Sequence, residues 1–318
     1  MSEETSTNNS AGPRRLSSGN LASTIFLKEE GLRAGWRLLI FVAFVIGIEF
    51  AVSLIVWMFG KPERGTFSIS NQFLMEFTGF VAVFGAAFVM SAIEHREFGT
   101  YGLPLAGALR TDFWLGWLFG FCEISALVGG IGLFGGYHFG SLAVHGVEIA
   151  RWAFLYLIFF MVVAFFEEFL FRGYALQTLA EGIGFWPAAI AVSLLFGAVH
   201  RQNPGENWIG VFGVFVVGLF WCFTVRRTGT LWFALGMHAS FDFGETFLYS
   251  VPDSGTIFPG HLSNAIIQGP AWLTGGSVGP EASLIDFLLL AIFFYAFHLM
   301  FPAKKTKAAE NLQTYRTL

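Results

Sequence analysis

Residues 36–59, WRLLIFVAFVIGIEFAVSLIVWMF, decide the fold class of this chain. The run is 24 residues long and almost entirely apolar, and about 20 residues of helix are enough to span the hydrocarbon of a bilayer. It is too long to be the apolar core of a cleavable signal peptide, so we expect it to remain as a transmembrane helix. Lipid offers no water to backbone polar groups, which excludes an open strand.

Seven further apolar runs follow, and with the first they predict an all-α polytopic membrane protein of about eight transmembrane helices. They cover residues 73–93, 113–135, 152–171, 185–200, 208–225, 231–249 and 284–301. The composition agrees, because 55% of the 318 residues are hydrophobic and 13% are charged, about half the charged share of a soluble protein. This balance excludes a soluble, disordered or collagen-like chain. No basic stretch is long enough to follow a nucleic acid.

The two ends of the chain are polar. Residues 1–34 predict a disordered cytoplasmic tail, residues 35–302 the membrane domain, and residues 303–318 a second cytoplasmic tail. With the N-terminus inside, eight spans place 14 Lys and Arg on the inner side and 4 on the outer side. This positive-inside bias predicts a multi-pass protein of the cell membrane with both termini in the cytoplasm. Residues 250–283 contain no Lys or Arg and many Gly and Pro, so we expect an irregular outer loop.

Ionisable residues inside the apolar runs indicate function, because a charge at the bilayer centre costs roughly 2.5–3.5 kcal/mol. The densest group is FFEEFLFR at residues 165–172. Glu168 and Arg172 lie one helical turn apart on one face and can pair. Glu167 points about 100° away and is free for another partner. The alternative is that both acids lie at the inner interface and extend toward water.

Two histidines and an aspartate add to this group. His200 ends one apolar run, and His238 lies four residues before Asp242 within another. The alternative is that each is a buried polar residue whose hydrogen bonds are satisfied locally or that links two helices by a hydrogen bond. Together with Glu167 and Glu168 they predict a buried polar active-site cavity for acid–base or metal chemistry. Such a site supports hydrolysis, because a poorly solvated carboxylate takes a proton from water, and imidazoles hold a metal ion or donate to an oxyanion.

Three motifs resemble those of a known family. Glu-Glu-x-x-x-Arg at 167–172, Phe-x-x-x-His at 196–200 and His-x-x-x-Asp at 238–242 occur in this order on separate apolar runs. The set resembles the CPBP family of intramembrane proteases, named for CAAX prenyl proteases and bacteriocin-processing proteins and also called Abi. The resemblance covers about residues 150–250, the expected protease core, and includes Phe-Arg-Gly-Tyr at 171–174.

The resemblance implies an intramembrane endopeptidase. It implies that Glu167 activates water, that Glu168 is its acidic neighbour and that Arg172 steadies the two acids. His200 and His238 match the family's two active-site histidines, and Asp242 stands where many members have Asn. The family is described both as zinc-dependent, with Glu167, His200 and His238 as the possible ligands here, and as a metal-free glutamate protease. The implied substrate is a membrane-embedded, prenylated or leader peptide, and the short chain looks like a bacterial inner-membrane member.

Two other functions are compatible with the sequence. A transporter also places acids in the membrane, and Glu49, Glu76 and Glu123 lie in the first three runs. Against a transporter, no pair of broken spans repeats between two halves, and we expect these three acids to form hydrogen bonds between helices. A non-catalytic member would instead bind a peptide or partner as an immunity protein. The oligomeric state and the natural substrate are left open.

Overall fold

The computed structural model describes residues 27–28, 31–59 and 68–303, without the side chains of 27–28 and 59. Most of the two predicted tails lies outside these residues. Each of the eight apolar runs forms a helix, which confirms the all-α class. The helices are α2 (Ala34–Phe59), α3 (Ile69–Glu94), α4 (Thr111–Leu133), α5 (Val147–Glu168), α7 (Phe185–His200), α8 (Trp208–Thr228), α9 (Trp232–Phe243) and α11 (Leu284–Met300).

The eight apolar helices differ in length. Within the described residues, five helices are long and apolar enough to cross a membrane. They are Ala34–Met58, Ile69–Glu94, Thr111–Leu133, Val147–Ile183 and Trp208–Thr228. The other three are shorter, with 16 residues in α7, 12 in α9 and 17 in α11. The chain is therefore a multi-pass membrane protein in which three of the eight apolar helices are shorter than the other five.

The fourth span runs past its predicted end at residue 171. A π-helical segment, η3 (Phe169–Ala175), follows α5 and leads into α6 (Leu176–Ile183). A second π-helical segment, η4 (Gly244–Leu248), follows α9. Single π-helical turns are rare and concentrate at functional sites. Here each of them directly follows a helix that carries one of the charged motifs.

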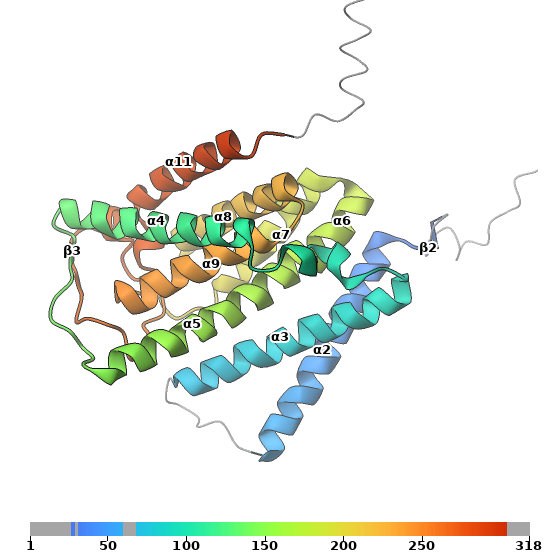
Figure 1. Cartoon of the computed structure of the whole chain (residues 1–318), viewed down its shortest axis with the longest axis horizontal. Coiled ribbons are helices and arrows are strands. Elements are labelled where there is room, and N and C mark those ends of the chain that lie inside the picture. Colours follow the sequence, from blue (N-terminus) through green and yellow to red (C-terminus); the bar gives the residue numbers. More distant parts are fainter. Residues whose placement is uncertain (1–26, 29–30, 60–67, 304–318) are drawn as a thin grey trace, which may run out of the picture.

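Figure 1 shows the helices in an ordered stack. From one edge to the other, α2, α3, α5, α9 and α4 pack side by side, and α11 contacts α4 and α8. The hairpin of α7 and α8 lies behind α9 in this view. The motif-bearing helices α5 and α9 are thus in the centre of the stack and contact each other.

Short elements organise the connections. Antiparallel β1 (Leu27–Lys28) and β2 (Gly31–Leu32) precede α2, and β3 (Tyr137–His138) pairs with β4 (Ile266–Ile267). The others are the 3₁₀ turns η1 (Phe98–Tyr101), η2 (Leu105–Gly107) and η5 (Pro280–Ala282) and the short helix α10 (Ala271–Thr274). The predicted irregular loop at 250–283 therefore contains three short elements, and β4 ties it to the connection between α4 and α5.

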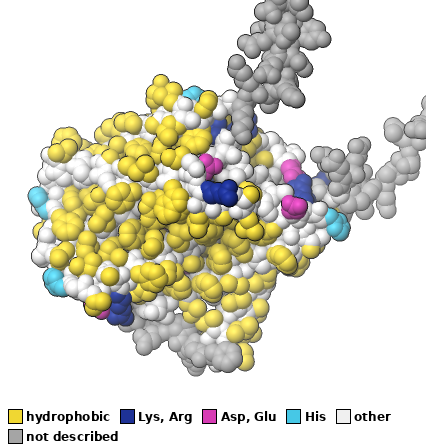
Figure 2. Space-filling view, in the orientation of Figure 1, with side chains coloured by type: hydrophobic (Ala, Val, Ile, Leu, Met, Phe, Trp, Pro, Cys, Tyr) yellow, Lys and Arg dark blue, Asp and Glu magenta, His cyan; other side chains and the backbone are white. Residues whose placement is uncertain are grey.

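The outer surface suits lipid. Apolar side chains cover most of the face in Figure 2, and the charged groups form small separate patches. Helix α2 is the clearest case, since Leu39, Ile46 and Phe50 are 58%, 63% and 71% exposed. In water such a continuous apolar surface would be unfavourable, whereas lipid tails solvate it. The bilayer is therefore the solvent of this protein.

Glycines bring α4 and α9 into close contact. A Cβ added at Gly116 would lie 2.0 Å from the Phe233 carbonyl oxygen, and one at Gly120 would lie 2.1 Å from that of Met237. Gly236 approaches Phe113 in the same way from the opposite helix, at 2.1 Å. Small residues four apart allow helix backbones to approach closely in membranes. This crossing sets the position of α9, which carries His238.

We expect Gly120→Ala to lower the free energy of unfolding by about 2 kcal/mol or more, because its methyl group would overlap a backbone carbonyl that cannot move aside. Gly129→Ala on the same helix is the control, since a Cβ there meets nothing within 4 Å. Both changes gain the same helix propensity. Unfolding of the two purified variants in detergent measures the difference, and equal stability would disprove the close crossing.

Candidate active site

Glu168 and Arg172 form a buried ion pair. Arg172 Nη1 donates to Glu168 Oε1 at 3.0 Å, and both side chains are 0% exposed. Four residues separate them across the end of α5 and the start of η3, as the sequence predicted. The Arg172 guanidinium also lies over the Phe196 ring, with its central carbon 4.0 Å from the ring centroid. The pair thus joins α5 to α7 behind the site.

His238 lies among three carboxyl groups. Its Nδ1 is 3.2 Å from Glu168 Oε1, and its Nε2 is 3.2 Å from Asp242 Oδ2 and 3.7 Å from Glu167 Oε2. Carboxyl oxygens therefore face both ring nitrogens, and neither nitrogen is open to a further ligand in this arrangement. The helical spacing of His238 and Asp242 produces their contact, and the packing of α9 on α5 produces the other two.

Glu167 and Glu168 occupy different environments although they are neighbours in the chain. Glu167 is 19% exposed and forms no contact with Arg172, whereas Glu168 is fully buried beside it. The 100° rotation between adjacent helical residues turns Glu167 toward the cavity described below. Glu168 reaches the site through its contact with His238.

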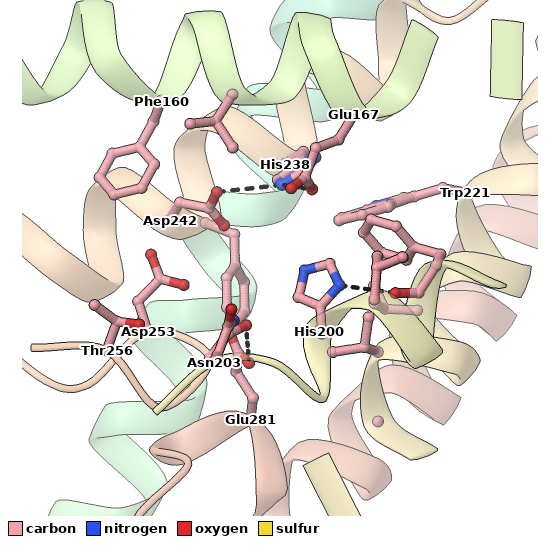
Figure 3. A pocket seen from close by; sticks show the side chains of 18 of the residues that line it. Phe160, Glu167, His200, Asn203, Trp221, His238, Asp242, Asp253, Thr256 and Glu281 are labelled. Atoms are coloured by element: carbon pink, nitrogen blue, oxygen red, sulfur yellow. Dashed lines mark hydrogen bonds and ion pairs between the residues drawn. The ribbon is translucent and has the colours of Figure 1, made fainter. Parts of the chain in front are cut away.

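His200 is fixed by its own helix. Its Nδ1 donates to the Phe196 carbonyl oxygen at 2.8 Å, which leaves Nε2 for another partner. Figure 3 shows the ring on the opposite side of the cavity from Glu167 and His238. Trp221 from α8 stacks on His238 with 4.4 Å between ring centroids. The two histidines are therefore held by different aromatic and backbone contacts.

A cavity of about 390 Å³ contains these groups, within the size range of ligand sites. Glu167, His200, His238 and Asp242 all line it, while Glu168 and Arg172 lie behind the wall. Other lining residues are Gln72, Glu76, Glu123, Phe159, Phe160, Asn203, Trp221, Asp253, Phe258, Glu281 and Asp286. No Lys or Arg is among the described residues that line it. The cavity is strongly acidic, with aromatic side chains in its wall.

The acids of the first three runs take different positions. Glu49 on α2 accepts a hydrogen bond from Thr78 of α3 at 2.8 Å, so for this residue the expected hydrogen bond between helices is confirmed. Glu76 instead accepts from Gln72 of its own helix at 2.9 Å and lines the cavity. Glu123 also lines the cavity, and neither of its buried carboxyl oxygens has a hydrogen-bond partner. For Glu76 and Glu123 the expectation of a helix-to-helix hydrogen bond is wrong.

Sequence reasoning missed the contribution of the outer loop. Asp253 and Glu281 line the cavity and belong to the loop at 250–283. The sequence of this loop has no helical periodicity, so residue spacing could not predict which groups they lie near. Burial raises the pKa of Glu281 to about 7 and that of Asp253 well above its usual range. Asn203 was also missed; it lies three residues after His200, in the polar connection between α7 and α8. Its spacing from His200, about one helical turn, is the sequence feature that could have indicated it as a site residue.

The possible zinc ligands do not fit a zinc site in this arrangement. Tetrahedral zinc binds nitrogen at about 2.0–2.1 Å and needs a free lone pair on each imidazole. Both ring nitrogens of His238 face carboxyl oxygens instead. Among the described residues, one group of three potential ligands has its atoms within 4.8 Å of one another, and it is not Glu167, His200 and His238.

Comparison with known proteins confirms the family resemblance. Residues 149–244 match the family model described as type II CAAX prenyl endopeptidase Rce1-like. The matched segment contains all three motifs and runs from α5 to the start of η4. It points to a protease embedded in a membrane. No curated protein matches the chain.

Proposed function

We propose that this protein is an endopeptidase that hydrolyses a peptide bond within or beside the membrane, with Glu167 as the general base. The observation that carries the proposal is the difference between the two adjacent acids. Glu168 is bound by Arg172, whereas Glu167 opens on the cavity that His200 also lines. A carboxylate that no Arg or Lys neutralises, in a poorly solvated site, is suited to accept a proton from water.

In the proposed reaction, a water molecule between Glu167 and His200 is the nucleophile. Glu167 takes one proton from it, and the free Nε2 of His200 accepts a hydrogen bond from its other O–H. The hydroxide oxygen attacks the carbonyl carbon, and the carbonyl oxygen becomes an oxyanion. Glu167 then returns the proton to the amide nitrogen, the C–N bond breaks, and a carboxylic acid and an amine result. His238 holds Glu167 and does not transfer a proton.

The oxyanion needs a donor other than Asp242. A carboxylate only accepts hydrogen bonds, and Asp242 is already 3.2 Å from His238. Asn203 lines the same cavity and carries an amide with two N–H donors. We assign the oxyanion contact to Asn203, which would replace the Asn that many family members have at the position of Asp242. This electrostatic contribution would act in a site largely shielded from water.

The proposed substrate is a membrane-associated peptide. The walls combine aromatic side chains such as Phe159, Phe160 and Phe258 with acids. A cavity of about 390 Å³ admits a short extended segment rather than a folded domain. Either a prenylated C-terminal peptide or a leader peptide meets these limits. Lipid around the bundle would deliver both from the side.

We also propose that both termini lie in the cytoplasm, on the basis of the positive-inside bias. Reporter fusions at Arg316 and within the loop at 250–283 should give signals from opposite sides of the membrane. Signals from one side would refute this topology.

The decisive test is hydrolysis by the purified chain in liposomes. Prenylated and leader peptides are offered in water enriched in ¹⁸O, and mass spectrometry should find one ¹⁸O in the new carboxylate. A transition-metal chelator such as 1,10-phenanthroline, which binds zinc, should leave the rate unchanged, and the protein should contain no stoichiometric zinc. A stoichiometric zinc ion whose removal stops cleavage would refute the metal-free mechanism, and binding without cleavage would favour an immunity or scaffold role.

A further inference from the structure

A second cluster of acids lies beside the candidate active site. Glu245 of η4, Asp253 of the following loop and Glu281 of η5 place carboxyl oxygens within 4.8 Å of one another. Asp253 and Glu281 line the side of the cavity away from Glu167 (Figure 3). The family match ends at residue 244, before all three of these acids. The cluster is therefore a feature of this chain that the protease motifs do not account for.

Glu245 is the reason to expect a ligand. It is 0% exposed, and no hydroxyl, amide or cationic donor among the described residues reaches either of its carboxyl oxygens, whose side-chain neighbour is the Glu281 carboxyl. A buried carboxylate without donors is costly. The groups around it are carboxyls as well, which raises that cost if all are ionised.

The other two acids are each held in place on one side. Thr246 Oγ1 donates to Asp253 Oδ2 at 3.0 Å, and Ser254 Oγ donates to Glu281 Oε2 at 3.0 Å. None of the three cluster acids forms an ion pair with a described Lys, Arg or His. The hydroxyl groups orient the carboxyls but supply no charge, so no described side chain neutralises the cluster.

We propose that Glu245, Asp253 and Glu281 bind one divalent cation of the hard, oxygen-preferring class, for which calcium is the probe. Calcium takes six to eight oxygen ligands, including carboxylates that bind through one or both oxygens. Three carboxylates can supply up to six. A site of oxygen atoms alone does not favour zinc or copper, which prefer nitrogen and sulfur ligands.

The position of the ligands gives the ion a structural role. Glu245 extends the helix that carries His238, whereas Asp253 and Glu281 belong to the start and the end of the outer loop. An ion bound to all three would fasten this loop to α9 and fix the part of the cavity wall that Asp253 and Glu281 form. It would also neutralise part of the negative charge that faces the cavity.

Isothermal titration of the full-length, chelator-treated protein in detergent with calcium chloride tests the proposal. We expect one calcium per chain and a rise in the melting temperature that a chelator reverses. Asp253→Asn and Glu281→Gln should each weaken binding about tenfold or more, because each removes one charged ligand. Glu148→Gln is the matched control, since it removes one acid that is 44% exposed and pairs with Arg151.

Two outcomes would overturn the cation site. The first is no calcium uptake near neutral pH with a melting temperature that rises on acidification, which would show that shared protons neutralise the cluster. The second is equal loss of binding in Asp253→Asn and in Asp286→Asn, which would show diffuse attraction by the acidic cavity. Both outcomes are read from calcium binding and stability and do not depend on proteolysis. Glu167→Gln should bind calcium like the unaltered protein. If one variant fails to fold, the other still tests the site.

Discussion

Glu167→Gln is expected to lower peptide hydrolysis at least about 100-fold, the lower end for loss of a general base. Glutamine keeps the shape of the side chain but cannot accept the proton from water. The side chain is partly exposed to the cavity and has no ion pair with Arg or Lys. The amount of protein in the membrane should therefore hardly change. Cleavage rate and abundance are measured on the same preparations.

Glu76→Gln is the matched control for this experiment. Glu76 is another acid in the wall of the same cavity, outside the three motifs, and it already accepts a hydrogen bond from Gln72. Its replacement removes the same charge, so it reports any general effect of making the cavity less acidic. If Glu76→Gln were as inactive as Glu167→Gln, cavity charge rather than a specific base would explain the loss. If Glu167→Gln still cleaved, the assignment of the base would be wrong.

Helical spacing alone predicted part of the site. Residues four apart share a helix face, which is sufficient for the contact of Glu168 with Arg172 and that of His238 with Asp242. The same periodicity turned Glu167 away from Arg172. The contact of His238 with both glutamates depends on how α9 packs against α5, and no local pattern encodes that. It was the resemblance to the family motifs that predicted one shared site for these residues.

Two features were beyond the reach of sequence reasoning. Polar Gln177 and Glu181 lower the hydropathy after residue 171, so the apolar run seemed to end there, although the helix continues through η3 and α6 to Ile183. The acids at 253 and 281 lie in a loop with neither helical nor strand periodicity. Turns rich in Gly and Pro determine the positions of these acids. From the sequence of such turns a local bend can be predicted, but not which distant residues come into contact.

Arg172→Met should be the most destabilising change in the site. Methionine preserves much of the apolar length of the side chain but leaves Glu168 buried without its cation. Breaking a buried ion pair by removing one partner typically costs about 3–5 kcal/mol. The cation–π contact with the Phe196 ring would be lost as well. Denaturant unfolding in detergent, followed by circular dichroism, measures the expected loss.

Adding Glu168→Gln to Arg172→Met distinguishes a charge effect from a packing effect. The double variant has no buried carboxylate to leave unpaired, so we expect it to regain more than half of the lost stability. It should still cleave poorly, because Glu168 also contacts His238 Nδ1 at 3.2 Å and that contact orients the ring beside Glu167. If the double variant is no more stable than Arg172→Met alone, the guanidinium stabilises the bundle by packing on Phe196. In that case the charge of the Glu168–Arg172 pair does not account for the stability of the active site.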